Sequence, residues 1–438
     1  MRGKIIRRIL RTILGLAILV ALLVGLIDRT PIVEQPFYNE TMHRIAYDPL
    51  KNNGSSQLNA GWAKVNITPG HSMPMAGYIP RDHFDSVHDS LYARIIVIDN
   101  GSFKAAMVNV DLLIFPPQLR DRIYEKIDSN TFLYLSATHT HNAVGGWDPS
   151  IGGRLITGSF SREYLDNIAD RISAAINNIT TQNASMQYWQ SDASDLIENR
   201  VDADSGKIDG KLRGIRLQRS DSTTAILFTL SAHATSIAKE SMELSADYPG
   251  KTIQLLEQKT NFAMFMSGMV GSTRFKFTPY QNYEFIDYVS PQLVQRIDSA
   301  RFDAAMTSPR IRSAHIPITF GPSQLRISKN WKINDWLFRL ILGKLKGEIT
   351  YLEFGDIVFV GTPCDFAGEI YAVDSLEQYA AKYDKHLIIT SFNGDYDGYI
   401  TYDKHYDRSS KEEINALNWV GPYYGKYFSD MIKTLVAR

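Results

Sequence analysis

The chain has almost no cysteine and no excess charge of either sign. Cys364 is the one cysteine among 438 residues, which excludes an intrachain disulfide and leaves stability to a buried core. The 47 Lys and Arg residues balance the 47 Asp and Glu residues, so no net positive field attracts nucleic acid. Repeats and low-complexity tracts are also lacking beyond the N-terminus. We therefore expect a globular domain whose partners do not include nucleic acid.

The N-terminus combines positive charge with an apolar run. Residues 12–27 carry no charge and end at Asp28-Arg29, and five basic residues come first: Arg2, Lys4, Arg7, Arg8 and Arg11. The run is shorter than the ~20 residues of a spanning helix, but interleaved apolar residues lengthen it and arginines can snorkel. We predict a transmembrane signal anchor over residues 1–29, with the remaining domain outside the cytoplasm. A cleaved signal peptide is the alternative, although no small-x-small cleavage site follows Ile27.

The rest of the chain indicates an α/β fold. Residues 30–58 are polar and predict an irregular tether, and residues 59–438 predict one large domain with a mixed β-sheet and flanking helices. Three strand pairs flank turn sequences, and helices and single strands alternate with them. The predicted strand pairs are 91–98 with 104–111, 213–219 with 223–230, and 350–354 with 357–361. The predicted helices are 117–127, 162–178 and 366–382, and the single strands are 132–137 and 387–391.

The segment 331–346 has apolar residues at helical spacing among lysines and arginines, with Trp331 and Trp336 near its start. Such a stripe usually packs on the core of a domain. The alternative is a helix on a membrane surface that helps a lipid to enter.

A His-x-His motif follows a buried apolar strand. His139 and His141 come after residues 132–137, and Gly145-Gly146 follow. In extended backbone, residues two apart point to the same face, so both imidazoles can converge on one point. Ligands commonly bind at the ends of strands in α/β proteins. The pattern predicts a metal or acid–base site, and a hydrogen-bonded loop pair is the alternative.

Two further candidates follow other predicted strands. His233 comes after the strand at 225–231, and Tyr399 lies in the polar segment after the strand at 387–391. Histidine nitrogens with an oxygen ligand suit Zn²⁺ in an open catalytic site. The sequence therefore predicts one zinc site at a shared sheet edge.

Several segments, in order along residues 61–405, resemble the neutral/alkaline (non-lysosomal) ceramidases. They are residues 61–69, 73–78, 87–94, 136–141, 228–236, 247–250 and 395–401. This resemblance implies hydrolysis of the amide of an N-acyl sphingoid lipid. It also implies zinc ligands at His139, His233 and Tyr399, substrate contacts at His141 and Arg200, and catalytic roles for His141 and Tyr399.

The chain departs from the family pattern at two places. The family's ligating Glu falls, without gaps, on Thr362, and Asp365 or Cys364 lies close enough to replace it. We expect Asp365 to be the fourth metal ligand, and the alternative is that it caps the helix predicted from residue 366. The stretch 271–274 also differs from the family's substrate-pocket motif.

These observations predict a zinc-dependent amidohydrolase that cleaves an N-acyl lipid such as ceramide and meets the membrane through its N-terminal helix. One alternative is a related hydrolase of another lipid or of a cell-envelope amide or ester. The other is a non-catalytic binding protein that has lost the family's Glu ligand.

Overall fold

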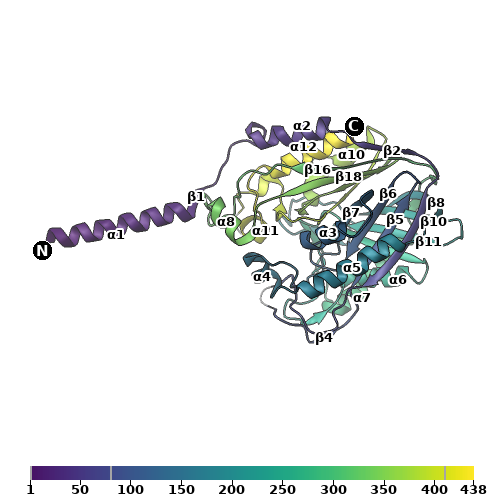
Figure 1. The fold of residues 1–438 in the computed structure, drawn as a ribbon, viewed down its shortest axis with the longest axis horizontal. Helices are drawn as coiled ribbons and strands as arrows, with labels where there is room; N and C mark the ends of the chain where they lie inside the picture. Colours follow the sequence, from purple (N-terminus) through teal and green to yellow (C-terminus); the bar gives the residue numbers. More distant parts are fainter. Residues whose placement is uncertain (1, 79–80, 409–410) are drawn as a thin grey trace.

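Two β-sheets pack face to face, and helices cover their outer surfaces (Figure 1). The computed structural model describes residues 2–78, 81–408 and 411–438. The order is helix, sheet, sheet, helix, so the mixed α/β fold expected from the sequence is confirmed.

Within the described residues the larger sheet has nine strands, ordered β13-β11-β10-β8-β3-β5-β6-β7, with β15 pairing to β8. Its strands are β3 (Asn59–Asn66), β5 (Tyr92–Asp99), β6 (Lys104–Val110), β7 (Thr131–Ala137), β8 (Gln182–Asp192), β10 (Lys211–Arg219), β11 (Thr224–Leu230), β13 (Phe262–Ser267) and β15 (Arg301–Phe302). The β6–β7 and β11–β13 pairs are parallel and the others are antiparallel.

The smaller sheet has five strands in the described part of the chain, ordered β2-β16-β18-β19-β21. They are β2 (Lys51–Ser55), β16 (Arg310–Ile318), β18 (Gly347–Phe354), β19 (Ile357–Gly361) and β21 (His386–Thr390). Only β19–β21 pairs in parallel among these described strands. The three predicted hairpins are confirmed as β5–β6, β10–β11 and β18–β19.

Alternation along the strands creates the layers. In β5, Ile95 and Val97 face the helices, whereas Ile96 and Ile98 face the second sheet. Successive side chains of a strand point to opposite faces, so an all-apolar strand is buried on both sides. Phe359 of β19 reaches the same layer between the sheets, and all five side chains are buried.

Helices cover the outer faces. The larger sheet carries α3 (Pro117–Tyr124), α5 (Arg162–Asn178), α6 (Asp247–Leu256) and α7 (Asn282–Asp298). The smaller sheet carries α2 (Pro36–Tyr47), α9 (Gly368–Val373), α10 (Leu376–Ala381) and α12 (Tyr424–Val436).

Short two-stranded pairs connect the loops. They are β1 (Val24–Leu26) with β17 (Trp331–Ile333), β4 (Ser86–Val87) with β12 (Glu243–Leu244), β9 (Ile197–Asn199) with β14 (Thr273–Phe275), and β20 (Asp365–Phe366) with β22 (Tyr399–Ile400). The remaining elements are α1 (Arg2–Leu23), α4 (Ile151–Thr157), α8 (Asp335–Leu342), α11 (Glu412–Asn415), and the 3₁₀ turns η1 (Ile32–Glu34) and η2 (Asp403–His405).

The predicted transmembrane helix over residues 1–29 is not supported. Helix α1 forms there and projects from the domain (Figure 1), but no helix among the described residues is long and apolar enough to cross a membrane. The physical reason is that all five basic residues lie in the first half of α1, which leaves a short uncharged run behind them.

Two other predicted segments are corrected. Residues 30–58 are not an irregular tether, because α2 buries Thr41 and Ile45 and β2 pairs with β16. Helix 366–382 is interrupted: α9 ends at Val373, and Ser375 has a left-handed φ of 53° before α10 begins. That conformation cannot continue a right-handed helix.

Segment 331–346 forms β17 and α8 rather than one helix. Phe338 and Leu345 are buried, as the core-packing interpretation expects, whereas Trp331, Trp336 and Leu340 are exposed.

Candidate metal centre

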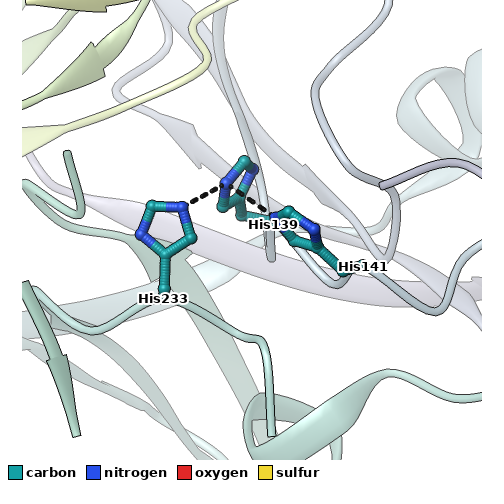
Figure 2. Close-up of side chains that lie close together, drawn as sticks. All are labelled: His139, His141 and His233. Atoms are coloured by element: carbon teal, nitrogen blue, oxygen red, sulfur yellow. Dashed lines mark hydrogen bonds between the residues drawn. The ribbon is translucent and has the colours of Figure 1, made fainter. Parts of the chain in front are cut away.

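Three histidines meet just beyond the carboxyl ends of two strands of the larger sheet (Figure 2). His139 and His141 follow β7, and His233 follows β11. The Nε2 of His139 lies 3.0 Å from the Nε2 of His233 and 3.4 Å from the Nε2 of His141. The three side chains each offer one nitrogen within 4.8 Å of the others. The pairing of both histidines of the His-x-His motif with His233 was expected, and the structure brings them together.

The backbone achieves this differently from the extended geometry that the motif suggested. His139 has φ of 60°, a left-handed conformation that is uncommon for a residue with a side chain. The turn lets His139 stack on Phe392, with ring centroids 4.3 Å apart, while His141 packs beside Tyr78. Unusual backbone of this kind is often found at functional sites.

The outer nitrogen of each imidazole contacts a backbone carbonyl. The Nδ1 atoms of His139, His141 and His233 lie 2.6, 3.0 and 2.9 Å from the carbonyl oxygens of Leu113, Gly77 and Val270. A carbonyl oxygen can only accept, so each Nδ1 carries the proton and donates it. In each neutral ring the inward-facing Nε2 then carries no proton and presents a lone pair.

Desolvation keeps these rings neutral. It lowers the pKa of His139 to about 3 and the pKa values of His141 and His233 well below their ordinary value. The neighbouring charge of Arg200 lowers all three further. The three Nε2 lone pairs therefore face one another at hydrogen-bond distance with no imidazole proton between them, an arrangement that a cation at their centre would stabilise.

Asp365 adds a carboxylate to the three lone pairs. Its Oδ1 lies 3.3 Å from the Nε2 of His139 and 3.7 Å from the Nε2 of His233. Because those nitrogens are neutral, these contacts are not ion pairs. Oδ1 is fully buried with no hydrogen-bond partner among the described residues, whereas Oδ2 accepts a 2.7 Å bond from the hydroxyl of Tyr396. Burial raises the pKa of Asp365 to about 7.

The other substitutes for the family's Glu lie elsewhere. Asp365 is not a helix cap, because it belongs to β20 and Ala367 precedes α9. Thr362 donates its hydroxyl to the carbonyl of Thr390, and Cys364 packs in the apolar layer around the smaller sheet. Asp365 is thus the carboxylate that the fold delivers to the histidines.

Tyr399 and Arg200 also reach this region. Tyr399 pairs with Asp365 in the β20–β22 register, and its hydroxyl donates to the Nε2 of His233 at 2.9 Å. Burial raises the pKa of Tyr399 well above its ordinary value, so the phenol is neutral. The guanidinium of Arg200 forms an ion pair with Glu413 of α11.

The sequence did not identify Tyr396, Glu413 or Phe392 as parts of the site. Tyr396 lies three residues before Tyr399 in the same polar segment, which is a usable signal. Glu413 carries none, because only the tertiary fold brings α11 to Arg200.

A cavity of about 400 Å³ opens beside His233. Its walls include the apolar side chains of Ile237, Phe275 and Phe285 and the basic side chains of Arg274 and Lys276. A larger cavity of about 560 Å³ lies behind the loop at 245–247 and contains none of the histidines of the centre. We take the smaller cavity as the approach to the centre because His233 lines it.

Comparison with known proteins agrees with this geometry. No curated protein sequence matches the chain. The fold is similar to the crystal structure of neutral ceramidase from Pseudomonas aeruginosa, with a TM-score of 0.73, 14% identity and coverage of 87% of this chain and 74% of that one. It is also similar to a ceramidase complexed with C2, with a TM-score of 0.71, 15% identity and coverage of 87% and 75%. The family model of the N-terminal part of the neutral/alkaline non-lysosomal ceramidases matches residues 59–274. The resemblance inferred from the sequence is therefore confirmed: residues 59–274 match the N-terminal domain of the neutral/alkaline ceramidases, and the fold of the chain is similar to that of neutral ceramidase.

Proposed function

We propose that this protein is a zinc-dependent amidohydrolase that cleaves the amide bond of an N-acyl lipid of the ceramide type. The observation that carries the proposal is the set of three inward-facing, unprotonated imidazole nitrogens and one carboxylate oxygen without a hydrogen-bond partner in a single site. Nitrogen and oxygen donors in this number suit Zn²⁺. The match of residues 59–274 to the ceramidase family model supports the amide as the bond that is cleaved.

His139, His233, Asp365 and Tyr399 are the proposed ligands. The backbone carbonyls of Leu113 and Val270 orient the two histidines. When bound, a zinc ion supplies Lewis-acid polarisation of a carbonyl and makes a neighbouring water more acidic.

His141 and Arg200 are left to act on the substrate. The Nε2 of His141 is a bare acceptor that can take the proton of the attacking water, and Gly77 holds the ring through Nδ1. The water oxygen bonds to the amide carbon, the carbon–nitrogen bond breaks, and His141 returns the proton to the departing amine. Arg200, held by Glu413, anchors polar groups of the substrate.

Metal content and hydrolysis test the proposal together. We expect the His139→Ala, His233→Ala and Asp365→Ala variants to lose both bound zinc and amide hydrolysis. The exposed His71 provides a matched control, and its His71→Ala variant should keep both. Full zinc loading and full hydrolysis in the His139→Ala and His233→Ala variants would refute the mechanism.

The related-hydrolase alternative is tested by product analysis with a panel of acyl amides and esters. Preferential cleavage of an ester, or of an amide without a sphingoid base, would replace the proposed substrate while leaving the metal centre unchanged.

A further inference from the structure

Exposed apolar side chains gather where α1 joins the domain. We call this set the junction face, and it comprises Leu22, Leu26, Ile327, Trp331, Trp336 and Leu340. Each is roughly half exposed or more, from 48% for Trp331 to 64% for Leu26. A contiguous exposed apolar surface with two tryptophans is unusual for a domain surrounded only by water.

Backbone pairing holds the junction face together. Strand β1 pairs with β17, which places Leu26 opposite Trp331. The Nδ2 of Asn334 and the Nε1 of Trp336 both donate to the carbonyl of Leu22, each at 2.8 Å. The carbonyl of Leu22, near the C-terminal end of α1, thus accepts hydrogen bonds from side chains of the domain, so the junction face is a fixed part of the fold.

The junction face extends toward the metal centre. Helix α4 contacts α8 and adds the exposed side chains of Ile151 and Leu155. The loop that carries His141 leads directly into α4. On the other side, Asn415 of α11 lines a cavity together with Ile327, and the same short helix carries Glu413. Figure 1 shows α4, α8 and α11 on the side of the domain from which α1 projects.

The two segments that form the junction face are rich in basic residues. Residues 2–27 contain five basic residues and no acidic one, and residues 326–346 contain six basic residues and one acidic residue. The whole chain carries equal numbers of both. The basic residues of segment 326–346, apart from the buried Arg326, lie in the elements that form the junction face, and those of α1 lie farther out, on the half of the helix away from the domain.

We propose that the junction face docks on an anionic lipid bilayer, with Trp331, Trp336 and Leu340 entering the headgroup region. Tryptophan favours the membrane–water interface, and lysines and arginines around an apolar face attract anionic headgroups. A protein partner would satisfy the apolar side chains but does not explain the excess of basic residues, whereas an anionic bilayer accounts for both. This surface does not depend on the proposed chemistry, although it would place the metal centre close to a lipid substrate.

A single fluorescent label tests the docking. Cys364 is fully buried, so a cysteine-reactive, polarity-sensitive dye will report an introduced exposed cysteine. We expect the labelled full-length Leu340→Cys variant to shift its emission to the blue on phosphatidylcholine vesicles with about 30% phosphatidylglycerol. The Tyr47→Cys variant is the control, because Tyr47 is 73% exposed at the end of α2, and it should not shift. Sedimentation with the vesicles without a shift at position 340 would mean that α1 alone binds, and it would overturn the proposal.

Charge reversal gives a second, independent measurement. Combining Lys329→Glu with Lys344→Glu should weaken vesicle binding at least about tenfold, and added salt should weaken binding of the unmodified chain. The pair Lys51→Glu and Lys382→Glu makes the same change in net charge on exposed lysines outside the junction face. Equal losses in both pairs would show a response to net charge alone and would contradict the proposal. Hydrolysis of a water-soluble short-chain amide is the separate readout for the proposed function, and neither pair should change it.

Discussion

Replacing Asp365 by Asn should weaken zinc binding and, at neutral pH, stabilise the metal-free protein. The substitution keeps the shape of the side chain and leaves an oxygen to accept the bond from Tyr396. The new amide group can donate to the bare Nε2 of His139, which lies 3.3 Å from Oδ1. The substitution thus removes a negative charge that would hold a cation, and it supplies a donor to the His139 lone pair that has none in the metal-free protein.

The magnitude follows from the pKa of Asp365. Burial raises it from 3.8 to about 7, a difference of about three units, and each unit corresponds to about 1.4 kcal/mol. Between these two values the folded metal-free protein binds a proton that the unfolded chain has released. Its stability therefore falls as the pH rises through this window, by up to about 4 kcal/mol. The Asp365→Asn variant has no carboxyl group to ionise at this position, so its stability does not fall in this way.

Urea unfolding with a chelator present, at pH 5 and pH 8, measures the effect. We expect the Asp365→Asn variant to exceed the unmodified protein in unfolding free energy at pH 8, with a smaller difference at pH 5. Zinc competition with a chromophoric chelator should show a loss of about 3–5 kcal/mol in binding, the usual consequence of removing one partner of a buried charged pair. The exposed Asp204 supplies the control variant Asp204→Asn, which should change neither quantity. Equal stability of the two proteins at both pH values, or unchanged zinc affinity, would refute the reasoning.

Three further outcomes are expected. The Tyr396→Phe variant should bind zinc about 10–100-fold more weakly with its fold intact, because only the hydroxyl that orients the buried carboxylate is lost. Chelator competition would measure the zinc affinity, and circular dichroism would check the fold. In steady-state kinetics the Glu413→Gln variant should raise KM more than it lowers kcat, because Arg200 loses the ion pair that positions it. The control variant Glu412→Gln, on the same helix, should leave KM and kcat unchanged. An equal effect of the two substitutions would contradict the role given to Glu413. The Phe359→Ala variant should lose about 3–5 kcal/mol of unfolding free energy, measured by urea denaturation, because the ring is fully buried between the two sheets.

Local chemistry explains which elements could be predicted. The β5–β6 hairpin was evident because Asp99-Asn100-Gly101 closes a turn between two β-rich runs, and the structure places Asp99 opposite Lys104. Helix α5 matches the predicted range 162–178, with the Ser161 hydroxyl accepting a bond from the Tyr164 amide at its start. Turn chemistry and side-chain periodicity act within a few residues, so they can be read without knowing the fold.

Segments with weak local signals were predicted less well. Residues 30–58 contain few apolar residues, yet Phe37 of α2 stacks on Tyr424 of α12 almost 400 positions away. The interruption of helix 366–382 at Ser375 is likewise invisible in the sequence, because Asp, Ser and Leu are all compatible with a helix. In both places tertiary packing overrides the local preference.

The sequence by itself determined the donors: two histidines after one strand, a third after another, and a tyrosine and an aspartate near the ends of two more. Only the tertiary structure decided that these groups share one centre, because β7, β11, β19 and β21 reach it through pairings between distant parts of the chain. The same long-range packing holds His139 in a left-handed backbone conformation and leaves Asp365 with a buried oxygen that has no hydrogen-bond partner among the described residues. Identity of the donors is a local property of the chain, whereas their direction and desolvation are set by everything that packs around them.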